Sequence, residues 1–336
     1  MNIGYLFITL FVAALGIVGN SLVIAALLVH RRLRVLNNTF IGNLAFADLL
    51  VAGIIHPFTA LGITRGKDFF SKPGGGDGDI IPLCSLLSAF CVISCTSSVF
   101  SIAAVAFNRY FYICHHRMYA RVYTRCTIPF YVAGIWFLAF LVDVPLFFGF
   151  GRHEFHTRAA TCIFDTTHKG YKLYFIGLGI LFPISVITYS YTRIVVLVVR
   201  ASRQRQNRIG TAEQTSSAAT GAAAQPVTKV KPADVKLLKT VAAIGVLGVI
   251  IYTPLSLTLL FDYGQVPKRV WMFSVGLMHS YSCINWCVYG LTNSNFRTAY
   301  KMIFKRYICR PFFKGSIDVI EDSVTNPTEM TGATTR

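Results

Sequence analysis

Long apolar stretches separated by short polar ones run through almost the whole chain. An α-helix needs about 20 residues to cross a bilayer, and each stretch approaches or exceeds that length once one intramembrane aspartate, Asp48, is allowed. The stretches without Lys, Arg, Asp or Glu, apart from Asp48, are 5–29, 39–64, 83–107, 126–142, 173–192, 240–261 and 270–292. The pattern predicts an all-α membrane protein, a seven-transmembrane helix bundle.

The polar connections divide the chain into one domain and two flexible segments. We expect residues 1–313 to form the membrane domain, with helices at about 4–29, 38–64, 83–114, 126–150, 171–200, 233–262 and 269–292. An amphipathic stretch at 295–307 predicts a short eighth helix, because Phe296, Tyr300 and Phe304 share one side. Residues 211–224 are rich in Ser, Thr, Ala and Gly, so we expect 201–231 to be a disordered loop and 314–336 a flexible tail.

Composition and charge placement exclude most soluble classes and orient the helices. Hydrophobic residues make up 54% of the chain and charged residues 14%, whereas a soluble domain has about 25% charged residues. Arg31, Arg32 and Arg34 directly follow the first helix, which places the N-terminus outside by the positive-inside rule. The net charge of +18 therefore indicates topology and anionic membrane lipids as neighbours, with no nucleic-acid partner. We expect the first helix to insert as its own anchor, since no cleavable signal precedes it.

Residues typical of one receptor family occur in the same order along this chain. The set comprises Gly19-Asn20, Asp48, Cys84, Ser98, Asn108-Arg109-Tyr110, Trp136, Pro183, Tyr191, Pro254, Asn285 and Tyr289. Across nearly its whole length the chain resembles a rhodopsin-like (class A) G-protein-coupled receptor. Any one motif is weak, but the ordered set is highly specific.

Within that family the chain is most similar to the melatonin receptors and related invertebrate orphan receptors. Residues 108–115 are close to the melatonin-receptor version, including Asn108 in place of the usual aspartate, and 231–234 open the sixth helix in the same way. Trp286 stands where most of the family has proline and melatonin receptors have alanine. The resemblance implies a plasma-membrane receptor that passes an extracellular ligand signal to a heterotrimeric G protein, of the inhibitory type, with arrestin and receptor kinases as further partners.

The ligand site departs from the melatonin-receptor pattern. Leu146, Thr166 and Gly179 stand where melatonin receptors place asparagine, glutamine and histidine, and Tyr252 stands where a tryptophan is usual. Of the loop residues that contact the ligand in melatonin receptors, only the aromatic one, Phe164, is present in this chain. The scaffold is therefore close to melatonin receptors, whereas the resemblance leaves the ligand itself open.

The other pocket positions argue against two ligand classes. Cys91 occupies the place of the aspartate that binds amines, and His279 occupies the place of the opsin lysine that binds retinal. Asp143 and His279 are titratable groups that hold either a polar ligand group or a structural hydrogen bond. The candidate pocket residues are Cys91, Cys95, Asp143, Leu146, Phe164, Gly179, Tyr252 and His279.

Asp48 is the clearest candidate in the sequence for a binding site inside the membrane. A carboxylate at mid-membrane needs a proton, a cation or hydrogen-bond donors, because burying it unpaired is costly. The resemblance places Ser98 and Asn285 beside Asp48 around a sodium ion, and we favour that interpretation over a protonated structural aspartate. No cofactor and no other metal is expected.

A switch is expected at the inner ends of the helices. The family pairs Arg109 of the Asn108-Arg109-Tyr110 motif with an acid at the start of the sixth helix, here Asp234, in the resting state. Tyr191 and Tyr289 would then meet near Arg109 when the sixth helix moves. The alternatives are solvated charges at two helix ends and interface tyrosines.

Three cysteines are given roles by position. The resemblance pairs Cys84 with Cys162 in an external disulfide, with free buried thiols as the weaker alternative. Cys309 follows the amphipathic stretch and is a candidate for palmitoylation. Two other functions have less support: a transporter or pump would need a retinal lysine or a relay of acids, and an enzyme would need clustered catalytic residues.

Overall fold

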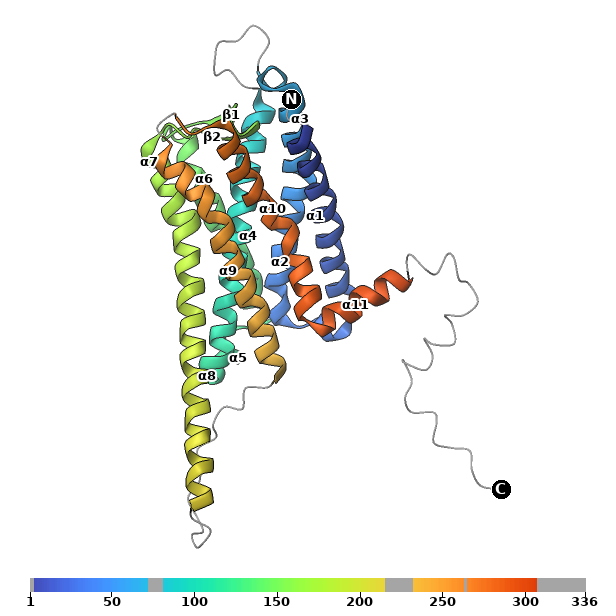
Figure 1. Cartoon of the computed structure of the whole chain (residues 1–336), viewed down its shortest axis with the longest axis vertical. Coiled ribbons are helices and arrows are strands. Elements are labelled where there is room, and N and C mark those ends of the chain that lie inside the picture. Colours follow the sequence, from blue (N-terminus) through green and yellow to red (C-terminus); the bar gives the residue numbers. More distant parts are fainter. Residues whose placement is uncertain (1–2, 72–80, 215–231, 263–264, 307–336) are drawn as a thin grey trace, which may run out of the picture.

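The long helices lie side by side and form one bundle (Figure 1). The computed structural model describes residues 3–71, 81–214, 232–262 and 265–306. The helical paths among these residues are α1 (Ile3–Val29), α2 (Thr39–Leu50) with α3 (His56–Arg65), α4 (Pro82–Cys114), α6 (Thr127–Phe147), α7 (Lys169–Tyr174) with α8 (Phe182–Gln214), α9 (Pro232–Phe261) and α10 (Lys268–Thr292). Two π-helical segments, Val51–Ile55 and Phe175–Leu181, join the halves of the second and fifth paths.

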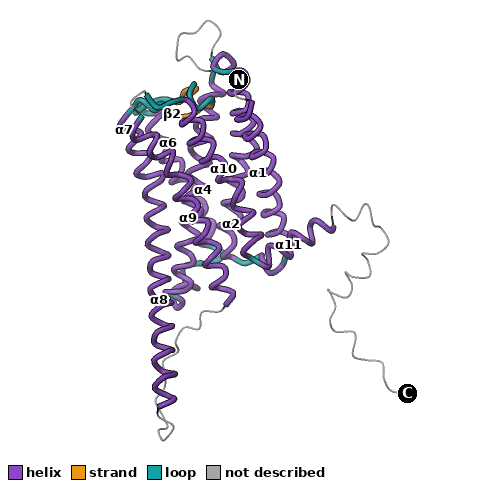
Figure 2. The backbone as a smooth tube through the Cα atoms, viewed as in Figure 1, coloured by secondary structure: helices purple, strands orange, loops and turns teal. Residues whose placement is uncertain are grey.

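Shorter elements lie at the two ends of the bundle (Figure 2). A two-stranded antiparallel hairpin, β1 (His153–His156) and β2 (Thr161–Phe164), pairs Phe155 with Cys162. We call the end of the bundle with this hairpin the hairpin end. The opposite end carries α5 (His116–Val122) and α11 (Ser294–Phe304), and we call it the α5 end. The 3-10 turns are Arg31–Leu33, Leu36–Asn38 and Lys67–Phe70.

Six of the seven paths contain helices long and apolar enough to cross a membrane, and α10 is not among them. The reason is that α10 carries polar side chains on its buried face, including Ser274, His279, Ser282 and Asn285. Packing against α9 and α1 removes that face from the surroundings of the bundle. Polar residues in such a helix face the bundle interior, where they find partners.

The central helix is α4, which packs against α2, α6, α8 and α9. Small residues on its surface, among them Ser94, Ser97, Ser101 and Ala103, are buried, and small residues let neighbouring helix backbones approach closely. The indole Nε1 of Trp136 on α6 donates to Asn43 Oδ1 on α2 at 2.9 Å. Asn43 Nδ2 donates in turn to Ser101 Oγ on α4 at 2.8 Å. This polar chain ties three helices together.

A second tie joins α1 to α10. Asn20 Nδ2 donates to the carbonyl oxygens of Gly16 at 2.9 Å and Ser282 at 2.8 Å. One residue earlier, a Cβ at Gly19 would lie 2.0 Å from the Trp286 ring. Only glycine therefore lets α1 approach α10 this closely with tryptophan at position 286.

The structure departs from the sequence prediction in two places. The loop between α6 and α7 contains the β1–β2 hairpin, which the helical pattern did not predict. The helix α8 continues to Gln214, although we predicted a disordered loop from residue 201. This extension is rich in Arg and Gln, which are favourable helix formers. Residues 215–231 and the predicted tail at 314–336 lie outside the described residues.

Candidate functional site

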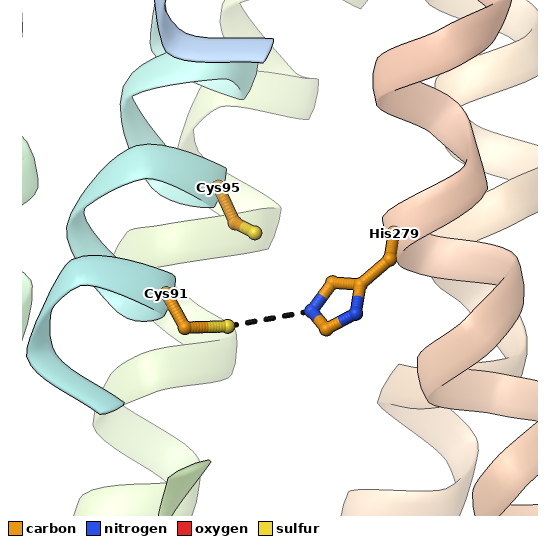
Figure 3. A group of neighbouring side chains, drawn as sticks. All are labelled: Cys91, Cys95 and His279. Carbon is orange, nitrogen blue, oxygen red and sulfur yellow. Dashed lines mark hydrogen bonds between the residues drawn. The ribbon is translucent and has the colours of Figure 1, made fainter. Parts of the chain in front are cut away.

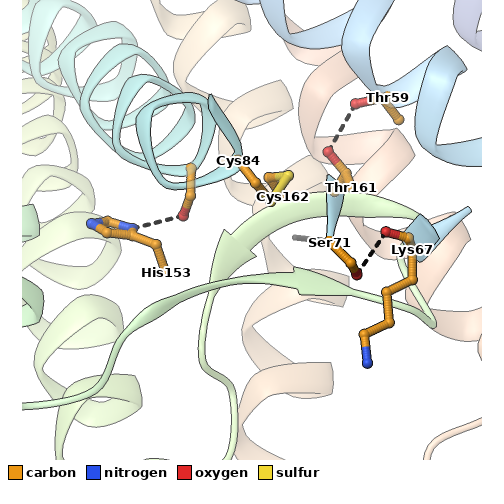
Figure 4. Close-up of a disulfide and its surroundings, with 8 residues drawn as sticks. Thr59, Lys67, Ser71, Cys84, His153, Thr161 and Cys162 are labelled. Carbon is orange, nitrogen blue, oxygen red and sulfur yellow. Dashed lines mark hydrogen bonds between the residues drawn. A yellow bond between two sulfur atoms is a disulfide. The ribbon is translucent and has the colours of Figure 1, made fainter. Parts of the chain in front are cut away.

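A disulfide holds the hairpin against the end of α4 (Figure 4). Cys84 and Cys162 are bonded with their Cα atoms 5.5 Å apart, which confirms the predicted pairing. Two hydrogen bonds add to it: Ser88 Oγ to His153 Nδ1 at 2.8 Å, and Thr59 Oγ1 to Thr161 Oγ1 at 3.0 Å. Both strands of the hairpin are thus fixed to the bundle.

The turn of the hairpin is clamped to the connection between α9 and α10. Arg158 donates to both carboxylate oxygens of Asp262, at 3.0 and 2.7 Å, and to the Val266 carbonyl at 3.1 Å. Trp271 Nε1 also donates to Asp262, at 3.1 Å, and the guanidinium lies 5.6 Å from the Trp271 ring centroid. His156 packs on the same ring, at 4.3 Å between centroids. Burial and the positive charge of Arg158 lower the pKa of His156 to about 4.

A small cavity lies beneath the hairpin, between α4, α9 and α10. Its volume is about 30 Å³, and none of the described side chains that line it is charged. Five of the candidate pocket residues from the sequence line it: Cys91, Cys95, Phe164, Gly179 and Tyr252. Asp143, Leu146 and His279 are buried but do not line this cavity.

Asp143 lies instead beside the hairpin. Its carboxylate is 0% exposed, and its Oδ2 lies 3.7 Å from His153 Nε2. Neither carboxylate oxygen has a hydrogen-bond partner among the described residues. Burial lowers the pKa of His153, which favours a neutral imidazole next to this acid.

Asp48, Ser98 and Asn285 meet in the middle of the bundle. Ser98 Oγ donates to Asp48 Oδ1 at 2.7 Å, and Asn285 Nδ2 donates to Asp48 Oδ2 at 2.6 Å. Asp48 is fully buried and forms no ion pair with a described residue. The side-chain oxygen of Asn285 is buried without a hydrogen-bond donor among the described residues. One carboxylate and one unused amide oxygen are the hard oxygen ligands that a small cation prefers.

The motif at the α5 end makes contacts that the sequence did not reveal. Arg109 and Tyr289 are buried, at 5% and 2% exposure, and the buried Tyr191 hydroxyl has no hydrogen-bond partner among the described residues. Asn108 Nδ2 donates to the Tyr119 hydroxyl on α5 at 3.2 Å, and that hydroxyl donates to Asn37 Oδ1. Asn108 thereby connects α4 to α5 and, through Tyr119, to the 3-10 turn Leu36–Asn38.

The rest of the predicted switch is only partly described. The Tyr110 hydroxyl pairs with His115 Nε2 at 2.8 Å. Asp234 lies in α9, but its side chain is outside the described residues, as is Cys309. Tyr119 and Asn37 carried no signal in the sequence, because their contacts join separate elements: α4, α5 and the 3-10 turn Leu36–Asn38.

The geometry and the comparisons with known proteins agree on the class. The family model described as 7 transmembrane receptor (rhodopsin family) matches residues 19–289. The chain therefore belongs to the rhodopsin family of seven-transmembrane receptors. It is a G-protein-coupled receptor and a multi-pass membrane protein, not an enzyme, and the transporter alternative has no support.

Relatives identify the branch of the family. The chain is 33% identical over 300 residues to melatonin receptor type 1B of Rattus norvegicus, covering 86% of this chain and 74% of that protein. It is also 33% identical to the type 1B receptor of Homo sapiens, covering 86% of this chain and 75% of that one. The crystal structure of squid rhodopsin superposes with a TM-score of 0.71 at 18% identity, covering 98% of this chain and 92% of that one.

Proposed function

We propose that this receptor lies in the plasma membrane with its hairpin end outside and binds a neutral, compact, largely apolar ligand in the cavity under the hairpin. Binding shifts the helices toward an arrangement that activates an inhibitory heterotrimeric G protein at the α5 end. The observation that carries the proposal is the cavity wall, in which no described side chain is charged.

The uncharged wall bears on ligand class because an ion leaving water needs a partner. Transfer of an unpaired ammonium group into such a site is strongly unfavourable, so a protonated amine is disfavoured. Phe164, Phe175, Tyr252 and Trp271 supply aromatic faces in the wall. These surfaces suit a neutral ring system.

The cavity volume implies movement on binding. About 30 Å³ holds roughly one water molecule, whereas ligand pockets have about 300–1,000 Å³. A ligand that occupies this cavity therefore selects a more open arrangement of hairpin and helices. Differential affinity for two arrangements is what allows a ligand to switch a receptor.

The relatives' names point to melatonin, but three departures point away from it. Leu146, Thr166 and Gly179 lack the polar side chains that the melatonin-receptor pattern has at those positions. When a ligand is recognised through hydrogen bonds to its site, binding is much weaker if those hydrogen bonds cannot form. We therefore place the ligand among neutral aromatic compounds other than melatonin.

A sodium ion at Asp48 would stabilise the resting arrangement. The carboxylate, Ser98 Oγ and the unused Asn285 Oδ1 are its ligands. The support is a fully buried acid with an unused amide oxygen on its neighbour. At the α5 end, Arg109 and Asp234 bias the same equilibrium, and the G protein, arrestin and receptor kinases bind there. Palmitoylated Cys309 and anionic lipids would anchor that end.

Ligand class is tested by measuring cyclic AMP in cells against matched neutral indoles and their amine analogues. We expect a neutral compound to lower cyclic AMP in a pertussis-toxin-sensitive manner. Gly179→Leu should reduce its potency, since a side chain there projects toward Thr96 and Val142. Gly134→Leu is the control, because nothing lies within 4 Å of that position. A response confined to amines, or equal effects of the two leucines, would contradict the pocket assignment.

Sodium and coupling are tested separately. Asp48→Asn should abolish the sodium dependence of basal signalling, whereas sodium-independent wild-type signalling would remove the ion from the proposal. Arg109→Ala should remove coupling. Asp234→Ala should raise basal activity modestly, because losing one contact shifts a two-state equilibrium only by the free energy of that contact. A toxin-insensitive response with unchanged cyclic AMP would refute the inhibitory type.

A further inference from the structure

Two thiols and an imidazole converge in the half of the bundle nearest the hairpin end (Figure 3). Cys91 and Cys95 lie one turn apart on α4, and both point toward His279 on α10. Cys91 Sγ is 3.3 Å from His279 Nε2, and the three ligand-type atoms all lie within 4.8 Å of one another. All three residues are buried, at 3%, 6% and 1% exposure.

We propose that Cys91, Cys95 and His279 bind a soft divalent transition metal ion, zinc. Thiolate sulfur and imidazole nitrogen are the ligands that zinc prefers, and three protein ligands with water in the fourth position make a common site. No motif in the sequence predicts this site, because 188 residues separate Cys91 from His279. The site does not depend on the proposed ligand or on sodium at Asp48.

The spacing is close to that of a bound ion. Zinc holds sulfur at about 2.3 Å and nitrogen at about 2.0–2.1 Å, so two tetrahedral ligands lie about 3.5–3.8 Å apart. The separation of Cys91 Sγ from His279 Nε2, 3.3 Å, is near that value, and no separation among the three ligand atoms exceeds 4.8 Å. Closing the longest gap takes a movement of about 1 Å, which rotation of two short cysteine side chains supplies.

The charge balance suits this buried place. Zinc binding displaces the two thiol protons to solvent, because the thiolate is the metal ligand. Two thiolates and a neutral imidazole then give a complex with no net charge. Cys91 and Cys95 line the uncharged cavity under the hairpin, and a neutral complex avoids the cost of burying a charge there.

A second buried histidine, His56, packs against the cluster. His56, at the start of α3, packs edge-on against His279 with ring centroids 5.6 Å apart. His56 is 3% exposed, and neither of its ring nitrogens has a hydrogen-bond partner among the described residues. Buried polar groups are normally paired, and this imidazole would gain a partner from a bound ion or its water.

The ion would connect α4 to α10 in the wall of the cavity. Both helices line the cavity, and toward the α5 end they carry Arg109 and Tyr289. A ligand that binds only the folded arrangement stabilises it by mass action. Zinc is therefore expected to raise the melting temperature of the receptor.

The test uses the full-length receptor, purified without a histidine tag and stripped with a chelator. Zinc should bind with one ion per receptor, raise the melting temperature, and protect Cys91 and Cys95 from alkylation, as measured by mass spectrometry. Cobalt in place of zinc should show a thiolate-to-metal charge-transfer absorption. Cys95→Ser and His279→Gln should each weaken zinc affinity by more than about 100-fold, since loss of outer-shell partners alone costs 10–100-fold.

Cys287→Ser is the matched control, since this partly buried free thiol on α10 lies outside the cluster, and it should bind zinc as the wild type does. Alkylation of the wild type keeps the proposal testable even if a variant fails to fold. The proposal is overturned if zinc leaves both thiols open to alkylation, if cobalt shows no thiolate absorption, or if Cys95→Ser binds zinc unchanged.

Discussion

The strength of the Arg158–Asp262 clamp can be predicted in numbers. Two charge-assisted hydrogen bonds from Arg158 to Asp262 join the hairpin turn to the connection between α9 and α10. Replacing Arg158 with methionine keeps the aliphatic stem but removes all three donated bonds. Asp262 then remains buried, with 2% of its side chain exposed. Its remaining donors include Trp271 Nε1 at 3.1 Å and the Val266 N–H at 3.4 Å.

The loss in free energy of unfolding caused by Arg158→Met lies between two limits. Breaking a fully buried ion pair costs about 3–5 kcal/mol, whereas an exposed pair contributes about 0–1 kcal/mol. Arg158 is 28% exposed, so solvent partly screens the pair and we expect a loss of about 2 kcal/mol. For a chain of 336 residues, that loss lowers the apparent melting temperature by roughly 3 °C.

The assay is a thermal melt of the purified receptor within a double-mutant cycle. Arg158→Met, Asp262→Asn and the double variant should show a coupling energy of about 1–2 kcal/mol. Arg152→Met is the control, because its contact with Glu154 is 3.7 Å long and Arg152 is 63% exposed. Additive single effects, or an equal loss in the control, would refute the argument that burial of Asp262 gives the clamp its strength.

Three further outcomes are expected. Cys162→Ser should lower the free energy of unfolding by about 4–5 kcal/mol in the loop-entropy model, since the disulfide spans 78 residues. Surface expression should fall as well. The control Cys126→Ser, at an exposed thiol, should change neither quantity. The pKa of His156 is about 4 in the folded receptor and 6.5 ordinarily, so its stabilisation is present above pH 6.5 and lost as pH falls. About 2 kcal/mol of the free energy of unfolding should be lost by about pH 5. His156→Phe should flatten the plot of melting temperature against pH, and a plot with the slope of the wild type would contradict this. Gly19→Ala should cost about 1–3 kcal/mol by overpacking, and adding Trp286→Ala should relieve it; strictly additive losses would show no clash.

The sequence alone determined that the chain is a seven-helix membrane receptor. Crossing a bilayer requires a long helix whose hydrogen bonds are all internal, so each span is visible in its own residues as a long stretch with few or no charges, even where, as in α10, polar side chains lower its hydropathy. The ordered motifs then predicted the family and the Cys84–Cys162 bond. They also singled out Asp48, Ser98 and Asn285, which the structure brings together.

Only the tertiary structure decided which side chains meet across the bundle. Cys91 meets His279 over 188 residues, and Arg158 meets Asp262 over 104, because the rotation and tilt of packed helices select such neighbours. Neither the apolar pattern nor the spacing within one helix carries that information. The hairpin is a similar case, since its strands are short and held by contacts with other elements. Local hydrophobicity therefore sets the number and length of the helices, whereas packing sets the cavity, the clamp and the thiol–imidazole cluster.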